Sequence, residues 1–267
     1  MSFITSTVRT DSFTAGYMKT GEGSKTLVIL PGLSVQSVLP YAGAVEKQYE
    51  AFLKDWTVYL IERRNELPAQ YSISDMARDT AAVMKALCIE KADVFGASQG
   101  GMITLTLAAD YPGFVNKIAV ASTSARIDDK RFEIISEWIS LARERKREEL
   151  YLSFAGKVYP PEFFNANKNA FITLSQGVND CELDHFITLA EGTLGFDITN
   201  QVKNINCPVF CAFDKDDAVL GADSGYEILN LFSGNPAFEL TVTEGFGHAV
   251  YDTDPAFPQK LYNFFMK

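Results

Sequence analysis

The stretch Asp93–Met102, which reads DVFGASQGGM, decides the fold of this chain. Its apolar residues Val94 and Phe95 predict a buried strand that runs into a Gly-x-Ser-x-Gly turn, and a largely apolar helix is expected after the turn. The two glycines of the turn let the strand and the helix approach each other closely. This arrangement predicts that the hydroxyl of Ser98 is held out at the carboxyl end of a sheet.

A strand, turn and helix of this kind form a nucleophile elbow, from which a serine attacks a carbonyl group. The backbone amide of Gln99 begins the helix and points toward the oxyanion that such an attack produces. A second amide is expected from Leu33, because Gly32 follows the short apolar run Leu27–Leu30 and lets the loop backbone pass close to a ligand. We therefore expect the amides of Leu33 and Gln99 to form an oxyanion hole.

The rest of the chain alternates predicted strands with predicted helices. An antiparallel edge pair is expected in residues 1–26, with a turn at Gly21–Gly23. The alternation predicts an α/β fold with a mostly parallel central sheet, flanked by helices and joined by right-handed crossovers. Strands are expected at residues 27–30, 56–61, 117–121, 208–213 and 238–243, and helices at residues 41–53, 74–87 and 255–265.

The alternation stops between about Ser124 and Phe196, where helical segments are expected in place of strands. The sequence therefore predicts a helical insertion, residues 125–196, between two parts of an α/β core, residues 1–124 and 197–267.

Within this insertion, the pair Pro160-Pro161 interrupts the helical pattern. The charged run Arg143–Glu149 is interpreted as the solvated face of a helix, with i,i+3 and i,i+4 pairs. Helices are expected over residues 132–142, 165–175 and 180–191.

The length fits one α/β domain with an insertion as well as it fits two small domains, and the first interpretation is preferred. The chain has 267 residues, of which 47% are hydrophobic and 22% charged, and its net charge of -10 argues against nucleic-acid partners. No secretory signal and no stretch long enough to span a bilayer is recognised, so a cytoplasmic protein that acts on a small molecule away from membranes is expected. Four scattered cysteines do not suggest disulfides, and Cys207 and Cys211 are interpreted as buried thiols. No metal or cofactor is expected.

A serine nucleophile needs a base, and the sequence offers two histidines. His185 lies within the helical insertion, where a lone histidine is more often a surface or packing residue. His248 follows the last predicted strand, so it is expected in a loop at the same edge of the sheet as Ser98. His248 is therefore the predicted base.

The base in turn needs a carboxylate, which is expected in a loop at the same edge of the sheet. The acidic cluster after the strand that ends near residue 213 meets this need. Asp217 is the preferred acid, Asp214 and Asp216 remain alternatives, and Asp128 after the preceding strand is a remote one. The aspartates that do not serve the base are expected to be surface loop residues or helix caps.

The chain order Ser98, Asp217, His248 resembles that of the α/β-hydrolase fold family, and the resemblance covers almost the full length. The segment Gly96–Gly101 is similar to the family's Gly-His-Ser-x-Gly-Gly, with alanine in place of histidine. Leu30–Gly32 looks like its His-Gly oxyanion loop, with proline at the histidine position.

Two further motifs near the carboxyl terminus carry the resemblance. Counting nine residues from Pro208, as in the family's Pro-x-x-x-x-x-Gly-x-x-Asp, leads to Asp217, although Asp214 replaces the glycine. The pair Gly247-His248, followed by Pro255, also matches. The resemblance implies that the insertion is a helical cap between late strands of the sheet.

The resemblance also implies hydrolysis through a Ser-His-Asp triad and an acyl-enzyme, most simply by a carboxylesterase. Within the family, a proline-type aminopeptidase, a C–C bond hydrolase, or a small-ligand receptor that retains the triad are the alternatives. Substrate contacts are expected from aromatic residues of the cap, Trp138, Phe132 and Phe164 first, with Phe163, Phe171 and Phe186 also available.

Overall fold

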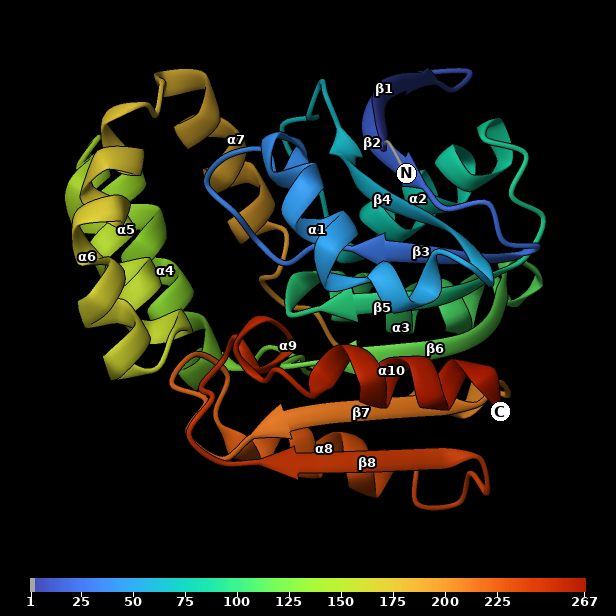
Figure 1. Cartoon of the computed structure of the whole chain (residues 1–267). Coiled ribbons are helices and arrows are strands. Elements are labelled where there is room, and N and C mark those ends of the chain that lie inside the picture. The colour runs from blue at the N-terminus through green and yellow to red at the C-terminus, as the bar shows by residue number, and fades with distance from the viewer. Residues whose placement is uncertain (1–2) are drawn as a thin grey trace.

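The computed structural model describes residues 3–267; residues 1 and 2, which belong to the predicted edge segment, lie outside the described residues. Within it, an eight-stranded sheet has the order β1-β2-β4-β3-β5-β6-β7-β8 (Figure 1). Strands β3 to β8 pair in parallel, whereas β1 and β2 are antiparallel to their neighbours. The predicted fold class, a mostly parallel sheet flanked by helices, is confirmed.

The elements follow the predicted alternation closely, and none of the helices in residues 3–267 has the length and apolar character needed to cross a membrane. The strands are β1 (Ile4–Arg9), β2 (Thr14–Thr20), β3 (Lys25–Leu30), β4 (Trp56–Arg64), β5 (Ala92–Ala97), β6 (Val115–Ala121), β7 (Val209–Asp214) and β8 (Phe238–Thr243). The helices are α1 (Ala42–Gln48), α2 (Ile73–Ala86), α3 (Gln99–Asp110), α4 (Asp129–Arg143), α5 (Arg147–Val158), α6 (Pro161–Gln176), α7 (Asp180–Glu191), α8 (Ala222–Leu231), α9 (Val250–Thr253) and α10 (Phe257–Met266).

The sheet has an apolar layer on each face. One layer includes residues of α2, α3 and α8, such as Met76, Met102 and Ile228. The other includes residues of α1 and α10, such as Ala42 and Leu261. Because both faces are covered, β5 is buried along its length and β3 is buried over Leu27–Leu30, as their continuous apolar runs predict.

The amino-terminal edge pair is present as β1 and β2, but its turn differs from the prediction. The chain reverses between β1 and β2 at Thr10–Phe13, where the Thr10 amide donates to the Phe13 carbonyl. The predicted turn at Gly21–Gly23 instead carries the chain from β2 to β3. Glycine is needed there because Gly21 has a φ of +76° and a Cβ at Gly23 would lie 1.9 Å from the carbonyl carbon of Asp55.

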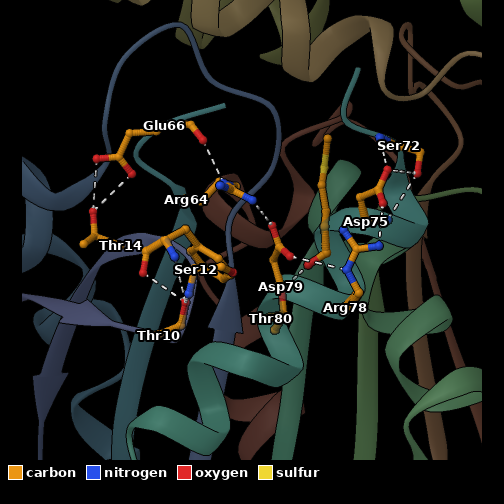
Figure 2. A network of polar contacts seen from close by, with 12 residues as sticks. Thr10, Ser12, Thr14, Arg64, Glu66, Ser72, Asp75, Arg78, Asp79 and Thr80 are labelled. Atoms are coloured by element: carbon orange, nitrogen blue, oxygen red, sulfur yellow. Dashed lines mark hydrogen bonds and ion pairs between the residues drawn. The ribbon is translucent and has the colours of Figure 1, made fainter. Parts of the chain in front are cut away.

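A polar network fixes the carboxyl end of β4 against α2 (Figure 2). Arg64 donates from Nε to the backbone carbonyl of Glu66, and its Nη1 lies 3.5 Å from Asp79 of α2. Arg78 pairs with Asp79 and with Asp75, whose carboxylate also completes a capping box at the start of α2. The network therefore orders the chain next to Arg63, which contacts the candidate site.

Helices α4 to α7 lie between β6 and β7 in the sequence and stand beyond the carboxyl ends of the parallel strands (Figure 1). The chain leaves and re-enters the sheet region along two adjacent segments, because the Ile127 amide donates to Phe196 and the Ile198 amide donates to Ala125. Apolar residues of these helices join the same core layer as α2 and α3.

The charged run Arg143–Glu149 is largely exposed and contains one i,i+3 pair, Lys146 with Glu149, as predicted, but it is not a single helix face. The run contains the break between α4 and α5, where Arg145 has a φ of +59°. Its arginines instead form ion pairs with α7: Arg143 with Glu191, Arg145 with Asp184, and Arg147 with Asp180. These exposed pairs connect the run to α7.

Candidate active site

Ser98 lies at the sharp turn between β5 and α3. Its backbone has a φ of +51° and a ψ of -119°, a region that a residue with a Cβ enters only at an energetic cost. The surrounding chain holds it there: the Ser98 amide donates to the Ala121 carbonyl at 2.9 Å, and Thr123 Oγ1 donates to the Ser98 carbonyl at 2.7 Å. The turn is thus fixed by β6 and by the loop that follows it.

The glycines of the turn are required by close backbone contacts. A Cβ at Gly96 would lie 2.2 Å from the Gly100 carbonyl oxygen, so no larger residue fits between β5 and α3. A Cβ at Gly100 would lie 2.0 Å from the carbonyl oxygen of Leu30, at the end of β3. Gly100 therefore lets α3 approach β3, whereas Gly96 lets β5 approach α3.

The structure brings Ser98, His248 and Asp217 into one chain of hydrogen bonds. His248 Nε2 lies 2.9 Å from Ser98 Oγ, and His248 Nδ1 lies 2.8 Å from Asp217 Oδ2. Both His248 and Asp217 are buried, with exposed fractions of 2% and 6%. A carboxylate only accepts hydrogen bonds, so Nδ1 carries the proton and Nε2 is left to accept the proton of the serine hydroxyl.

Asp217 is held ionised by its surroundings. Burial by itself would raise the pKa of this carboxyl, but the charge and hydrogen bond of His248 and the amides of Leu220 and Val219 together hold the pKa below its usual value. Those two amides both donate to Oδ1, at 2.9 Å and 2.8 Å. Each carboxylate oxygen of Asp217 therefore has a partner, and the side chain has one orientation.

Asp214 was expected to be a surface loop residue or a cap if it did not serve the histidine, and this was wrong. Asp214 is fully buried and accepts hydrogen bonds from the Thr243 hydroxyl and from the amides of Phe246 and Gly247. The amide of Asp216 donates to it as well. Asp214 thus fixes the loop that carries His248, whereas Asp217 contacts the imidazole itself.

The remaining candidates lie away from Ser98. Asp216 is exposed and accepts from the Gly245 amide at 2.9 Å. Asp128 caps α4 by accepting from the Arg131 amide, and His185 is exposed on α7.

The two predicted oxyanion donors line the cavity that contains Ser98. Within residues 3–267, neither the Leu33 amide nor the Gln99 amide donates to a backbone acceptor. The loop after β3 passes directly beside the serine, since a Cβ at Gly32 would lie 3.3 Å from the Ser98 Cβ. Both amides are therefore free to bind an acceptor from a ligand.

The Gln99 side chain is fixed by a contact that the sequence did not predict. Arg63 donates from Nη2 to Gln99 Oε1 at 2.9 Å, and Gln99 Nε2 donates to the Leu189 carbonyl at 2.7 Å. Burial lowers the pKa of the Arg63 guanidinium to about 10, although Tyr71 and Glu62 raise it. Gln99 is thereby tied both to β4 and to α7.

The cavity in front of Ser98 has a volume of about 800 Å³. Of the three predicted substrate contacts, Trp138 lines it, whereas Phe132 and Phe164 do not. Phe132 lies on α4 and packs against the core layer that includes residues of α2 and α3. Phe164 packs against the Phe171 ring, with the ring centroids 6.2 Å apart. The apolar part of the wall includes Ile135, Trp138, Phe154, Val158, Phe171 and Leu174.

A polar part of the same cavity was not predicted. It contains Tyr49, Tyr159, Tyr251 and Asp252, which come from α1, α5 and α9 or their ends. The only signal in the sequence was that Tyr251 and Asp252 follow His248 by three and four positions. Such closeness does not reveal which way the side chains point.

The cysteine thiols do not line this cavity. Cys211 is buried and Cys207 is half-buried, and burial raises the pKa of their thiols to about 12 and about 11. In the part of the chain that the structure describes, no three His, Cys, Asp or Glu side chains gather in the manner of a metal site.

Comparisons with known proteins show what the chain is similar to. A model of the α/β hydrolase fold family matches residues 25–255. RutD of Caulobacter vibrioides, a provisionally named carbamate hydrolase, is 24% identical over 225 residues, which cover 81% of this chain and 83% of that protein. The human serine hydrolase BPHL is 28% identical over 148 residues, 48% of each chain.

Solved structures extend the likeness over the whole fold. The enol-lactonase of Burkholderia xenovorans LB400 has a TM-score of 0.83 at 16% identity, covering 98% of this chain and 100% of that one. With a family match that spans most of its length, the chain belongs to the α/β hydrolase fold family.

Proposed function

We propose that this hydrolase cleaves carboxylic esters of small, largely apolar molecules through a serine nucleophile. The observation that carries the proposal is the continuous series of hydrogen bonds from Asp217 through His248 to Ser98. It ends at a cavity of about 800 Å³, which is within the usual size of a small-molecule site. The serine, base and acid needed for acyl transfer are therefore present together.

The first half of the proposed reaction forms an acyl-enzyme. Ser98 Oγ attacks the ester carbonyl carbon while its proton moves to His248 Nε2, at a starting distance of 2.9 Å. Asp217 stabilises the imidazolium that results, because its carboxylate stays ionised beside Nδ1. The tetrahedral intermediate then expels the alcohol, which receives the proton from Nε2.

The oxyanion is bound by the free amides of Leu33 and Gln99. Each such donor contributes about 3 kcal/mol of transition-state stabilisation in enzymes of this type. In the second half, His248 takes a proton from water, the water attacks the acyl group, and Ser98 is released with its proton restored. No step requires a group beyond the side chains and amides named.

We also propose that residues 125–196 act as a cap on a core formed by residues 1–124 and 197–267. The adjacent strand-like segments at residues 125–127 and 196–198 support this division, because they bring the two connections together. Gln36, in the loop after β3, bonds to Tyr151 of α5 and to Glu182 of α7. These contacts tie the cap to the loop that also carries Leu33.

Burst kinetics test the proposal. Nitrophenyl and methyl esters of the same short acid form the same acyl-enzyme, which either water or an added alcohol can attack. Both substrates should therefore give the same ratio of free acid to the ester of the added alcohol. The nitrophenyl ester should also release about one equivalent of nitrophenol in a burst if deacylation is slow. A different ratio for the two esters would rule out the shared intermediate, and tight binding without turnover would favour the receptor alternative.

A further inference from the structure

Arg63, near the end of β4, carries a charge that has no carboxylate as a direct partner. Its side chain is half-buried, and its Nε is sealed from solvent without a hydrogen bond. None of the ion pairs within residues 3–267 includes Arg63, whereas the neighbouring Arg64 pairs with Asp79. Burial lowers the pKa of the Arg63 guanidinium to about 10, which still leaves it charged at neutral pH. Because burying an unpaired cation costs free energy, such a group indicates that its charge has a use.

The Arg63 side chain is bonded to the candidate site. In the described residues it makes one hydrogen bond, from Nη2 to Gln99 Oε1 at 2.9 Å. The amide group of Gln99 is also held at its other atom, because Nε2 donates to the Leu189 carbonyl in the last turn of α7. No backbone amide of residues 3–267 donates to that carbonyl. Gln99 is thus fixed between a cation and the negative end of a helix.

The end of β4 holds both elements that supply the oxyanion donors of the proposed reaction. Successive side chains of a strand point to opposite sides, so Glu62 and Arg63 reach different elements. Glu62 accepts from the Val38 amide at 2.7 Å and thereby holds the loop after β3, which carries Leu33. Arg63 holds Gln99 at the start of α3. Of these two adjacent side chains, the one that reaches Gln99 brings a positive charge.

The order of the strands places this charge on the oxyanion side of the reaction. Along the sheet, β4 and β3 lie on one side of β5, which leads to Ser98 (Figure 1). The strands that lead to Asp217 and His248, β7 and β8, lie on the other side. During attack, negative charge develops on the substrate oxygen and positive charge on His248. A cation on the β4 side therefore favours the first charge and is kept away from the second.

We propose that Arg63 is a positioning residue for the oxyanion hole, and that its charge, held against Gln99, favours the tetrahedral oxyanion over the bound ester. This rests on the proposed ester hydrolysis at Ser98. A bound ester is neutral and the tetrahedral intermediate is an anion, so the charge should act on kcat and leave KM nearly unchanged. It should equally favour any ligand that becomes a tetrahedral anion on Ser98.

Kinetics with the methyl ester of a short acid test the charge, because slow acylation keeps KM close to the dissociation constant. Arg63→Gln keeps an amide donor but not the charge, and should lower kcat about tenfold with KM within about twofold. Arg63→Lys keeps the charge and should restore kcat to within about threefold of the wild type.

Arg9→Gln is the matched control, because Arg9 is exposed on β1, lies outside the cavity and loses the same charge. It should leave both constants unchanged. The inference would be overturned by a kcat that Arg63→Gln does not lower, or by equal losses in Arg63→Gln and Arg63→Lys.

Butylboronic acid tests the same charge without turnover, because its boron adds to a serine hydroxyl as a tetrahedral anion. In calorimetry, Arg63→Gln should bind this acid about tenfold less tightly than the wild type, and Arg9→Gln as tightly as the wild type. Gln99→Met is a second variant that serves if Arg63→Gln does not fold. It keeps the backbone amide but removes the acceptor that holds Arg63, and should weaken binding about threefold. Wild-type affinity in either folded variant would refute the inference.

The two measurements separate this inference from the ester chemistry. Ester cleavage that Arg63→Gln does not slow would reject the role of Arg63 and leave the proposed function. A wild type that cleaves no ester, but binds the boronic acid about tenfold more tightly than Arg63→Gln, would retain the role of Arg63 and reject the proposed function. A wild type that neither cleaves an ester nor binds the boronic acid would reject both.

Discussion

The turn between β5 and α3 and the helix α6 both border the same cavity, but they are held in different ways. All six residues of β5 and eleven of the twelve in α3 are buried, and the backbone of Ser98 between them bonds to Ala121 and to the Thr123 hydroxyl. In α6, Ser175 is the one buried residue, and the helix packs mainly on α5. The reacting group is thus set by the sheet, whereas this part of the cavity wall can change at little cost to the fold.

The largest effect that this difference predicts is the loss of the nucleophile. Ser98→Ala should lower kcat by about four to six orders of magnitude, because no other group can form the acyl-enzyme. Thermal unfolding should change little, since within residues 3–267 the hydroxyl bonds only to His248. Steady-state kinetics and a melting curve measure both. Wild-type activity in a folded Ser98→Ala protein would place the chemistry elsewhere.

Substitutions of the two buried aspartates at the end of β7, Asp214 and Asp217, should have different effects. Asp217→Asn should lower kcat by about 10⁴-fold, because an amide no longer holds His248 in the reactive tautomer. Asp214→Asn should instead lower the free energy of unfolding by about 2 kcal/mol, since it weakens a carboxylate that accepts from the loop of His248.

Urea unfolding and kinetics on both variants make this comparison. Asp216→Asn is the control, because that side chain is exposed and accepts one amide. The assignment of the acid would be reversed if Asp214→Asn removed activity while Asp217→Asn removed only stability.

A smaller effect is expected on α6, where two half-buried phenylalanines differ in what they face. Phe171 lines the cavity and Phe164 does not. Phe171→Ala should raise KM for esters of long acids by about fivefold, which is about 1 kcal/mol of lost apolar contact. Phe164→Ala should leave KM as it is and reduce stability modestly. Equal shifts in KM would mean that the substrate does not lie along α6.

Much of the sheet and of the site could be predicted because both depend on local sequence. Apolar runs of four to six residues bounded by glycine or proline indicate buried strands, and carboxyl ends of parallel strands meet at one edge. That argument alone places Ser98 and His248 at the same edge. It cannot separate Asp217 from Asp214, because Asp214 ends β7 and Asp217 follows it closely, and the difference depends on Phe246, Gly247 and His248, which lie far along the chain.

The helices of residues 125–196 were less predictable, because their ends and packing also depend on partners far along the chain. The sequence pattern of residues 144–146 does not mark the break between α4 and α5, and Arg145 there pairs with Asp184 of α7, which lies far along the chain. Helical spacing also places Phe132 and Phe164 on the apolar faces of their helices, but it does not reveal which neighbouring element covers each face. No helix was predicted at α8, whose buried side includes the small residues Ser224 and Gly225.

The central claim is that Ser98 is activated by His248, and labelling with a fluorophosphonate probe tests it most directly. Peptide mass spectrometry should locate the label on Ser98 in the wild type, and His248→Ala should abolish it while the protein stays folded. A folded wild-type protein that is labelled on another residue, or labelling of Ser98 that persists without His248, would contradict the account.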